Sequence, residues 1–157
     1  VLPEFIGKKT EAEKLHLTLK FLGEIDEDKS EKVKEKLKDI KFKCFETEIN
    51  NLGFFDNQKS NRYEKQIIVW LNMSNCNKLQ KETDNSLREI FQPEQRFMSH
   101  LTIARVKSVK NKREFLERLN KIKIPKVSFM VENFKLKSSI PKSEGPVYWD
   151  IEKYKLE

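Results

Sequence analysis

The sequence predicts an α+β fold in which one unit of secondary structure occurs twice. The expected elements follow in the order strand, helix, strand, strand and helix, after which the same order begins again, as is typical of α+β proteins. Two His-Leu-Thr tripeptides, beginning at His16 and His100, lie in corresponding strands of the two halves. The next helix is expected from Asp26 in one half and from Asn111 in the other, which is 10 and 11 residues after the histidine. This spacing indicates a duplicated unit with one histidine in each copy.

The first half is expected to hold one helix among several strands. Asp26 is a suitable N-cap for a helix that runs to about Asp39. The run Gln-Ile-Ile-Val-Trp-Leu over 66–71 is typical of a buried strand. The other strands are expected over 15–22, which ends at a turn at Gly23, over 41–49 and over 52–55, with a polar loop over 56–62. The apolar face of the helix comprises Val33, Leu37 and Ile40.

The second half is expected to hold two further helices, over 75–91 and 111–122, and Pro93 follows the first of them. Strands are expected over 99–106, 127–136 and 147–156. The helices carry the apolar stripes Leu79, Leu87, Ile90, Phe91 and Phe115, Leu119, Ile122.

Composition favours a single domain with a polyanionic partner. The 157 residues suit one domain or two small lobes that share a core. The 32 Lys and Arg residues outnumber the 25 Asp and Glu residues, which gives a net charge of +7. A basic balance attracts polyanions, of which nucleic acid is the usual one. A solvated lysine-rich surface is the alternative interpretation.

Two cysteines, Cys44 and Cys76, stand far apart and form neither a metal-binding pair nor a disulfide framework. We therefore expect free thiols in a reducing compartment, namely the cytoplasm. No apolar run is long enough to cross a membrane and no signal peptide opens the chain, so no membrane partner is expected. We also expect a monomer.

The two His-x-Thr motifs are the strongest functional signal. They are His16-Leu17-Thr18 and His100-Leu-Thr102, and they contain both histidines of the chain. A second His-Leu-Thr by chance is expected on the order of once in two hundred. Side chains two apart on a strand share one face, so each motif presents an imidazole beside a hydroxyl. The leucine between them faces the core.

This pairing suits chemistry at phosphorus. In-line displacement needs a base on the attacking side and an acid on the leaving side, and histidine serves in both roles. Threonine hydroxyls can donate hydrogen bonds to the non-bridging oxygens and stabilise the developing charge. A structural histidine is the alternative for either residue taken singly. A zinc site is disfavoured, because two histidines without clustered acids or thiols are too few ligands. We expect no metal and no cofactor.

The residues His16-Leu-Thr-Leu-Lys-Phe-Leu-Gly23 and His100-Leu-Thr-Ile-Ala-Arg105 resemble the paired motifs of the RNA 2′,3′-cyclic phosphodiesterases, also called 2′–5′ RNA ligases. These enzymes belong to the two-histidine phosphoesterase superfamily. The resemblance extends to Gly23-Glu-Ile, to Gly53-Phe54-Phe55 with Asp56-Asn57, and to Leu136-x-x-Ser139 followed by Gly145-Pro146-x-Tyr148.

The resemblance implies a bilobal α+β fold with a central cleft between two pseudo-symmetric antiparallel sheets and flanking helices, in which each lobe supplies one motif. It implies metal-independent hydrolysis of RNA 2′,3′-cyclic phosphate ends to 2′-phosphomonoesters. His16 would then donate a proton to the leaving 3′ oxygen and His100 would activate water. Thr18, Thr102 and Arg105 would hold the phosphate. Only 15 residues precede His16, so we expect the usual N-terminal strand to be lacking.

Several residues beside the motifs remain open to two interpretations. Arg105 lies an odd number of positions from His100, so it reaches the phosphate only from a strand end or a bulge; an exposed or bracing arginine is the alternative. Lys20 either adds charge beside His16 or extends to water. Two sets are left open in the same way: Phe54, Phe55, Tyr148 and Trp149 for base stacking or core packing, and Lys107, Lys110, Lys112 and Arg113 for RNA backbone contacts or a solvated turn.

Two rival functions use the same residues. Reversible 2′–5′ ligation of RNA, including tRNA halves, would need the same histidines and threonines. A catalytically silent RNA-binding module would keep the fold, although a mere binder has no need of both imidazoles.

Overall fold

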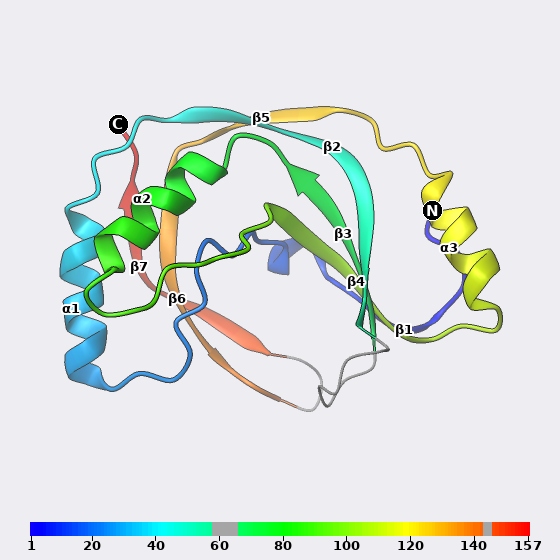
Figure 1. Ribbon diagram of the computed structural model, residues 1–157, viewed down its shortest axis with the longest axis horizontal. Coiled ribbons are helices and arrows are strands. Elements are labelled where there is room, and N and C mark those ends of the chain that lie inside the picture. Colours follow the sequence, from blue (N-terminus) through cyan, green and yellow to red (C-terminus); the bar gives the residue numbers. More distant parts are fainter. Residues whose placement is uncertain (58–65, 143–145) are drawn as a thin grey trace. The chain divides into compact units, whose positions relative to one another are not determined.

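The computed structural model of the protein describes residues 1–57, 66–142 and 146–157. These residues form an α+β structure in two compact units, whose elements are labelled in Figure 1. Unit 1 comprises Val1–Thr18, Glu48–Ser74 and Ser99–Ser128, and unit 2 comprises Leu19–Thr47, Asn75–Met98 and Phe129–Glu157. The predicted α+β class and the division into two lobes are confirmed.

The described strands form two sheets. The larger sheet has the strand order β1-β4-β3-β2-β5, and the smaller sheet pairs β6 with β7. The strands are β1 Ile6–Lys9, β2 Phe45–Asp56, β3 Ile67–Met73, β4 His100–Ser108, β5 Val127–Val131, β6 Asn133–Ile140 and β7 Val147–Lys155.

Three α-helices lie in the described residues, α1 Glu27–Lys38, α2 Asn77–Leu87 and α3 Lys112–Asn120. Asp26 caps α1 by accepting a hydrogen bond from the Lys29 N–H at 2.8 Å, as the sequence predicts. Asn111 caps α3 in the same way, from the Glu114 N–H at 3.2 Å.

Helix α2 is shorter than the predicted 75–91. Asn75 has a positive φ of 63°, so the helix begins only after it. At the other end the N–H groups of Ile90 and Phe91 both donate to the Leu87 carbonyl at 2.9 Å, which replaces the helix by a turn.

Each unit has its own hydrophobic core. In unit 1, α3 packs on one face of β3 and β4, and the buried residues are Ile67, Val69, Ala104, Val106, Phe115 and Leu119. In unit 2, α1 and α2 pack with the β6–β7 sheet, and the buried residues are Val33, Leu37, Leu79, Leu87, Phe134, Leu136, Tyr154 and Leu156.

Four strand predictions were wrong in their bounds or type. The predicted strands 41–49 and 52–55 form one strand, β2. The predicted strand 127–136 is divided at Glu132, whose carbonyl accepts the Leu156 N–H at 2.8 Å, so β5 and β6 enter different sheets. Strand β1 was not predicted. The expected strand over 15–22 is absent apart from one bridge at Leu17. Most of the expected loop 56–62 lies outside the described residues.

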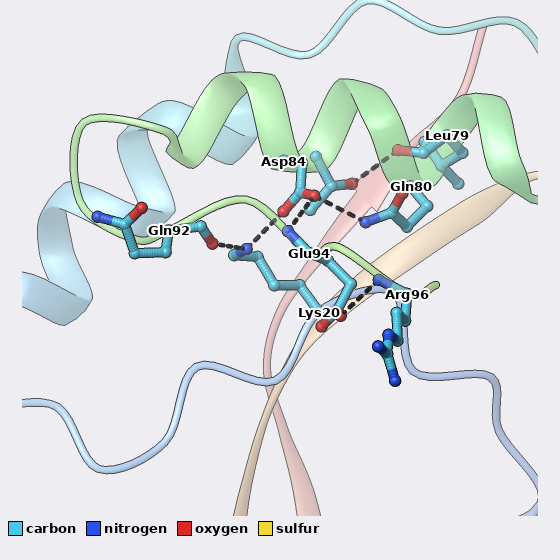
Figure 2. Close-up of polar contacts among 8 residues, drawn as sticks. Lys20, Leu79, Gln80, Asp84, Gln92, Glu94 and Arg96 are labelled. Carbon is cyan, nitrogen blue, oxygen red and sulfur yellow. Dashed lines mark hydrogen bonds and ion pairs between the residues drawn. The ribbon is translucent and has the colours of Figure 1, made fainter. Parts of the chain in front are cut away.

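Lys20, two residues after the first motif, forms a buried ion pair in unit 2. Lys20 Nζ binds the Asp84 carboxylate and the Gln92 carbonyl, the latter at 2.8 Å (Figure 2). Asp84 also accepts hydrogen bonds from Gln80 Nε2 at 3.0 Å and from the Glu94 N–H at 2.7 Å. The Lys20 side chain is only 6% exposed. It therefore does not extend to water, and its charge is engaged by Asp84.

No helix of the described residues is long and apolar enough to cross a lipid bilayer.

Candidate active site

Both His-x-Thr motifs lie in unit 1, on two neighbouring stretches of chain. The second motif begins β4, and Leu17 of the first motif forms an antiparallel bridge with Leu101 of the second. The expectation that each lobe supplies one motif is therefore wrong, because Val1–Thr18 and Ser99–Ser128, which contain the two motifs, both belong to unit 1. The first motif lies directly beside the second motif, at the start of β4.

The register of this bridge sets the relation between the four polar side chains. Because Leu17 is opposite Leu101 in an antiparallel pair, His16 is opposite Thr102, and Thr18 is opposite His100. These four residues form what we call the motif quartet. Opposed residues have Cβ atoms ~5 Å apart and diagonal ones ~7–8 Å apart. The two imidazoles therefore occupy one diagonal of the quartet and the two hydroxyls the other.

Side chains alternate between the two faces of the sheet, and this places the quartet on the face opposite the core. Leu101 is buried and Leu17 is half-buried, whereas both histidines and Thr102 are half-buried and Thr18 is exposed. Side chains of successive residues point to opposite faces of a sheet. The polar atoms of the quartet thus gather on the face that α3 does not cover.

His16 has a defined hydrogen bond on one side of its ring. Its Nδ1 lies 2.7 Å from the Lys14 carbonyl oxygen. A carbonyl oxygen accepts only, so Nδ1 carries the hydrogen of this bond. Lys14 is the last residue of the 3-10 turn Ala12–Lys14.

His100 is held against two aromatic rings of the same sheet face. The ring centroids of Phe55 and His100 are 5.3 Å apart with an interplanar angle of 87°, and those of Trp70 and His100 are 6.3 Å apart. Phe55 and Trp70 also contact each other, at 5.2 Å between centroids. We call these two rings the aromatic wall. Edge-to-face contacts of this kind restrict the orientation of the imidazole.

Arg105 reaches the quartet face because β4 contains a bulge. Thr102 pairs with Trp70, but Ala104 already pairs with Val69, so Ile103 is an extra residue. Arg105 is consequently opposite Ile68, on the same face as Trp70 and the quartet, and its side chain is exposed. The bulge is one of the two conditions under which the sequence allowed Arg105 to contact phosphate.

The remaining candidate residues fall into different places. Phe54 packs against the core of unit 1, whereas Phe55 belongs to the aromatic wall. Tyr148 and Trp149 lie on β7 in unit 2. Lys112 forms an ion pair with Asp56 at 2.7 Å and Arg113 with Glu117 at 2.9 Å, while Lys107 and Lys110 are exposed.

Gly145 of the closing motif lies outside the described residues. Within the described ranges, no three His, Cys, Asp or Glu side chains gather as metal ligands.

The aromatic wall depends on a glycine that sequence reasoning did not single out as a site residue. A Cβ added at Gly53 would lie 2.3 Å from Trp70 Cη2 and 2.4 Å from its Cζ2. Glycine within a strand often marks such a close approach, and here it lets the indole lie flat over β2.

We expect Gly53→Ala to displace Trp70 and to disturb His100. Because the indole is rigid and contacts Phe55, the overpacking should cost about 1–3 kcal/mol of unfolding free energy, measured by urea denaturation. The second substitution Trp70→Phe removes the clashing ring atoms, so the double variant should recover part of this loss. Unchanged stability of Gly53→Ala would contradict the close approach.

Comparison with known proteins identifies relatives over most of the chain. The model of the LigT-like phosphoesterase family matches residues 2–63 and 72–148. The RNA 2′,3′-cyclic phosphodiesterase of Methanocaldococcus jannaschii is 34% identical over 152 residues, which cover 94% of this chain and 83% of that protein. The protein of the same name from Thermotoga maritima is 34% identical over 142 residues, covering 87% of this chain and 72% of that protein.

Solved structures share the fold at lower sequence identity. Escherichia coli LigT in complex with 3′-AMP has a TM-score of 0.74 and 22% identity, and the match covers 99% of this chain and 84% of that one. TT0787 of Thermus thermophilus has a TM-score of 0.71 and 23% identity, covering 94% of this chain and 81% of that one.

Proposed function

The chain belongs to the LigT-like phosphoesterase family, and from this premise we propose that it hydrolyses the 2′,3′-cyclic phosphate at the end of an RNA to a 2′-phosphomonoester. The observation that carries the proposal is the Leu17–Leu101 bridge, because its register makes neighbours of the two His-x-Thr motifs. Relatives that are at least 30% identical over most of their length bear the name of this activity.

The proposed reaction is an in-line displacement at phosphorus. Water attacks the phosphorus as His100 takes its proton, the bond to the 3′ oxygen breaks, and His16 protonates that oxygen. The diagonal placement of the two imidazoles supports an acid–base pair, since base and acid must flank the phosphorus. The hydrogen bond from His16 Nδ1 to the Lys14 carbonyl orients the ring for proton transfer in either role, and the acid role of His16 is part of the proposal.

The two threonines and Arg105 are proposed to hold the phosphate. Thr18 and Thr102 occupy the other diagonal of the quartet, from which their hydroxyls can donate to the two non-bridging oxygens. Arg105 can add a charged donor from beyond the bulge. The expected cytoplasmic location is consistent with Cys44 and Cys76, between which no disulfide forms.

We expect the protein to open a 2′,3′-cyclic mononucleotide in the presence of EDTA. The measurement is product formation by chromatography with 2′- and 3′-phosphate standards, and the 2′-phosphate should be the product. A 3′-phosphate product would reverse the assigned leaving group. Binding of the nucleotide without turnover would identify a silent RNA-binding module, and joining of RNA ends without hydrolysis would identify a ligase.

A further inference from the structure

A second basic side chain lies on the quartet face, on the edge strand of the sheet. In the register of β1 and β4, Lys8 is directly opposite Arg105. Directly opposed residues of an antiparallel pair point to the same face. Since the bulge turns Arg105 to the quartet face, Lys8 points there too, and both side chains are exposed.

Three cross-strand pairs therefore follow one another along β4. They are Thr18 with His100, then His16 with Thr102, then Lys8 with Arg105. Two residues of a strand span ~6.8 Å, so the last pair lies about one nucleotide's reach beyond the quartet. Arg105 is on the same strand as Thr102, whereas Lys8 lies farther out, on the edge strand β1.

The Lys8–Arg105 pair brings two like charges together. Like charges directly opposite each other on a sheet are destabilising. Among the described residues, no acidic side chain forms an ion pair with either of them. The Glu11 carboxylate is bound by Lys14 at 2.6 Å. The hydrogen bond from Lys14 is the main cause of the lowered pKa of Glu11, and the charge of Lys8 is the smallest of its causes. An anion from a ligand would offset this repulsion.

The surroundings of His100 indicate which part of a ligand that anion belongs to. The aromatic wall lies on β2 and β3, on one side of β4, while Lys8 lies on β1, on the other side. The nucleic-acid backbone is anionic and its bases are aromatic. An RNA chain that extends from the quartet therefore meets positive charge for its backbone over β1.

On the basis of the proposed function, we infer that Lys8 binds the phosphodiester one nucleotide before the terminal cyclic phosphate. The preferred substrate is then the end of an RNA chain rather than a free cyclic nucleotide. Arg105 contacts the terminal phosphate, and Lys8 is a specificity-determining residue that touches only a substrate with an upstream phosphate.

Two dinucleotides that end in a 2′,3′-cyclic phosphate test this inference. One has an ordinary phosphodiester and the other an uncharged methylphosphonate linkage. We expect the wild-type protein to favour the charged linkage in kcat/KM by roughly threefold to fivefold. Lys8→Ala should bring this ratio close to one, and it should reduce the dependence of log KM on log salt by about 0.7 for the charged substrate.

Two variants serve as controls. Lys8→Arg keeps the charge and should keep the preference. Lys9→Ala removes a neighbouring exposed lysine that is opposite Ala104, on the other face, so it should also keep the preference. Lysines commonly protect edge strands from pairing with other chains; if that were the role of Lys8, Lys8→Ala would aggregate without a change in the ratio.

The outcomes separate the inference from the proposed function. Hydrolysis of both dinucleotides with equal kcat/KM by the wild-type protein overturns the role of Lys8 and leaves the reaction intact. A preference that survives in Lys8→Ala also overturns it. Failure to hydrolyse either dinucleotide or a cyclic mononucleotide overturns the proposed function, and this inference with it.

Discussion

Replacing either His16 or His100 by alanine is expected to lower kcat for cyclic phosphate hydrolysis by a factor of about 10²–10⁴. In the proposed reaction the two imidazoles act on the same phosphorus, one as acid and one as base, so neither replaces the other. The wild-type profile of kcat/KM against pH should be bell-shaped, because one ring must be protonated and the other neutral. Each single variant should lose one limb of the bell.

Both variants should remain folded, which makes the kinetic effect interpretable. The two imidazoles are only half-buried, and the core of unit 1 lies on the other face of the sheet. Thermal denaturation followed by circular dichroism provides the control. Wild-type turnover by a folded His16→Ala or His100→Ala protein would show that the substituted residue is not part of the chemistry.

The second large effect concerns stability and the Lys20–Asp84 pair in unit 2. The Lys20 and Asp84 side chains are 6% and 11% exposed. Asp84→Asn should lower the free energy of unfolding by about 3–5 kcal/mol, because the Lys20 charge is then left buried without its counter-ion. For a protein of this size the melting temperature should fall by roughly 10 °C.

The double variant Lys20→Met, Asp84→Leu separates the charge effect from loss of packing. Removing both charges together should restore most of the stability lost in Asp84→Asn. Asp150→Asn is a matched surface control, since Asp150 pairs with Lys135 and Lys137 in an exposed setting. It should change the melting temperature little. Equal melting temperatures for Asp84→Asn and Asp150→Asn would contradict the buried pair.

The same pair predicts a pH dependence. Burial raises the pKa of Asp84, but hydrogen bonds from Lys20, from the Glu94 N–H and from Gln80 outweigh it, so the pKa lies below its ordinary value. A depressed pKa stabilises the folded state above the ordinary aspartate pKa of about 3.9, and this contribution is lost as the pH falls through the folded value. Acid unfolding of the wild-type protein should therefore steepen below about pH 4, and Asp84→Asn should lack this component.

The elements that sequence predicts well are those with local signals. Asp26 and Asn111 fix the starts of α1 and α3 through a side-chain bond to a residue three positions on, so the signal and its effect lie within one turn. Strand β3 is equally clear, because its buried run has no helical alternative of sufficient length. The duplicated His-Leu-Thr tripeptide likewise carries its pattern within a few residues.

The features that could not be predicted from the sequence depend on contacts between residues that are far apart in the chain. Strand β1 is a short edge strand with no apolar alternation, and only its partner β4 makes it a strand. The expected strand of the first motif is reduced to one bridge at Leu17, and after the motif Lys20 binds Asp84, 64 residues away. The bulge at Ile103 turns the Arg105 side chain to the quartet face, and no local sequence pattern predicts the bulge. The contact between Gly53 and Trp70 also arises only when β2 pairs with β3.

The convergence of His16 and His100 on one phosphate is tested most directly by NMR of the imidazole nitrogens. The chain has two histidines and no others, so each ring gives a resolved set of long-range ¹H–¹⁵N signals that single-histidine variants assign. Titration with a nucleoside 2′-monophosphate should shift both sets together, with one dissociation constant. A shift confined to one ring, or two unrelated dissociation constants, would contradict a shared phosphate site.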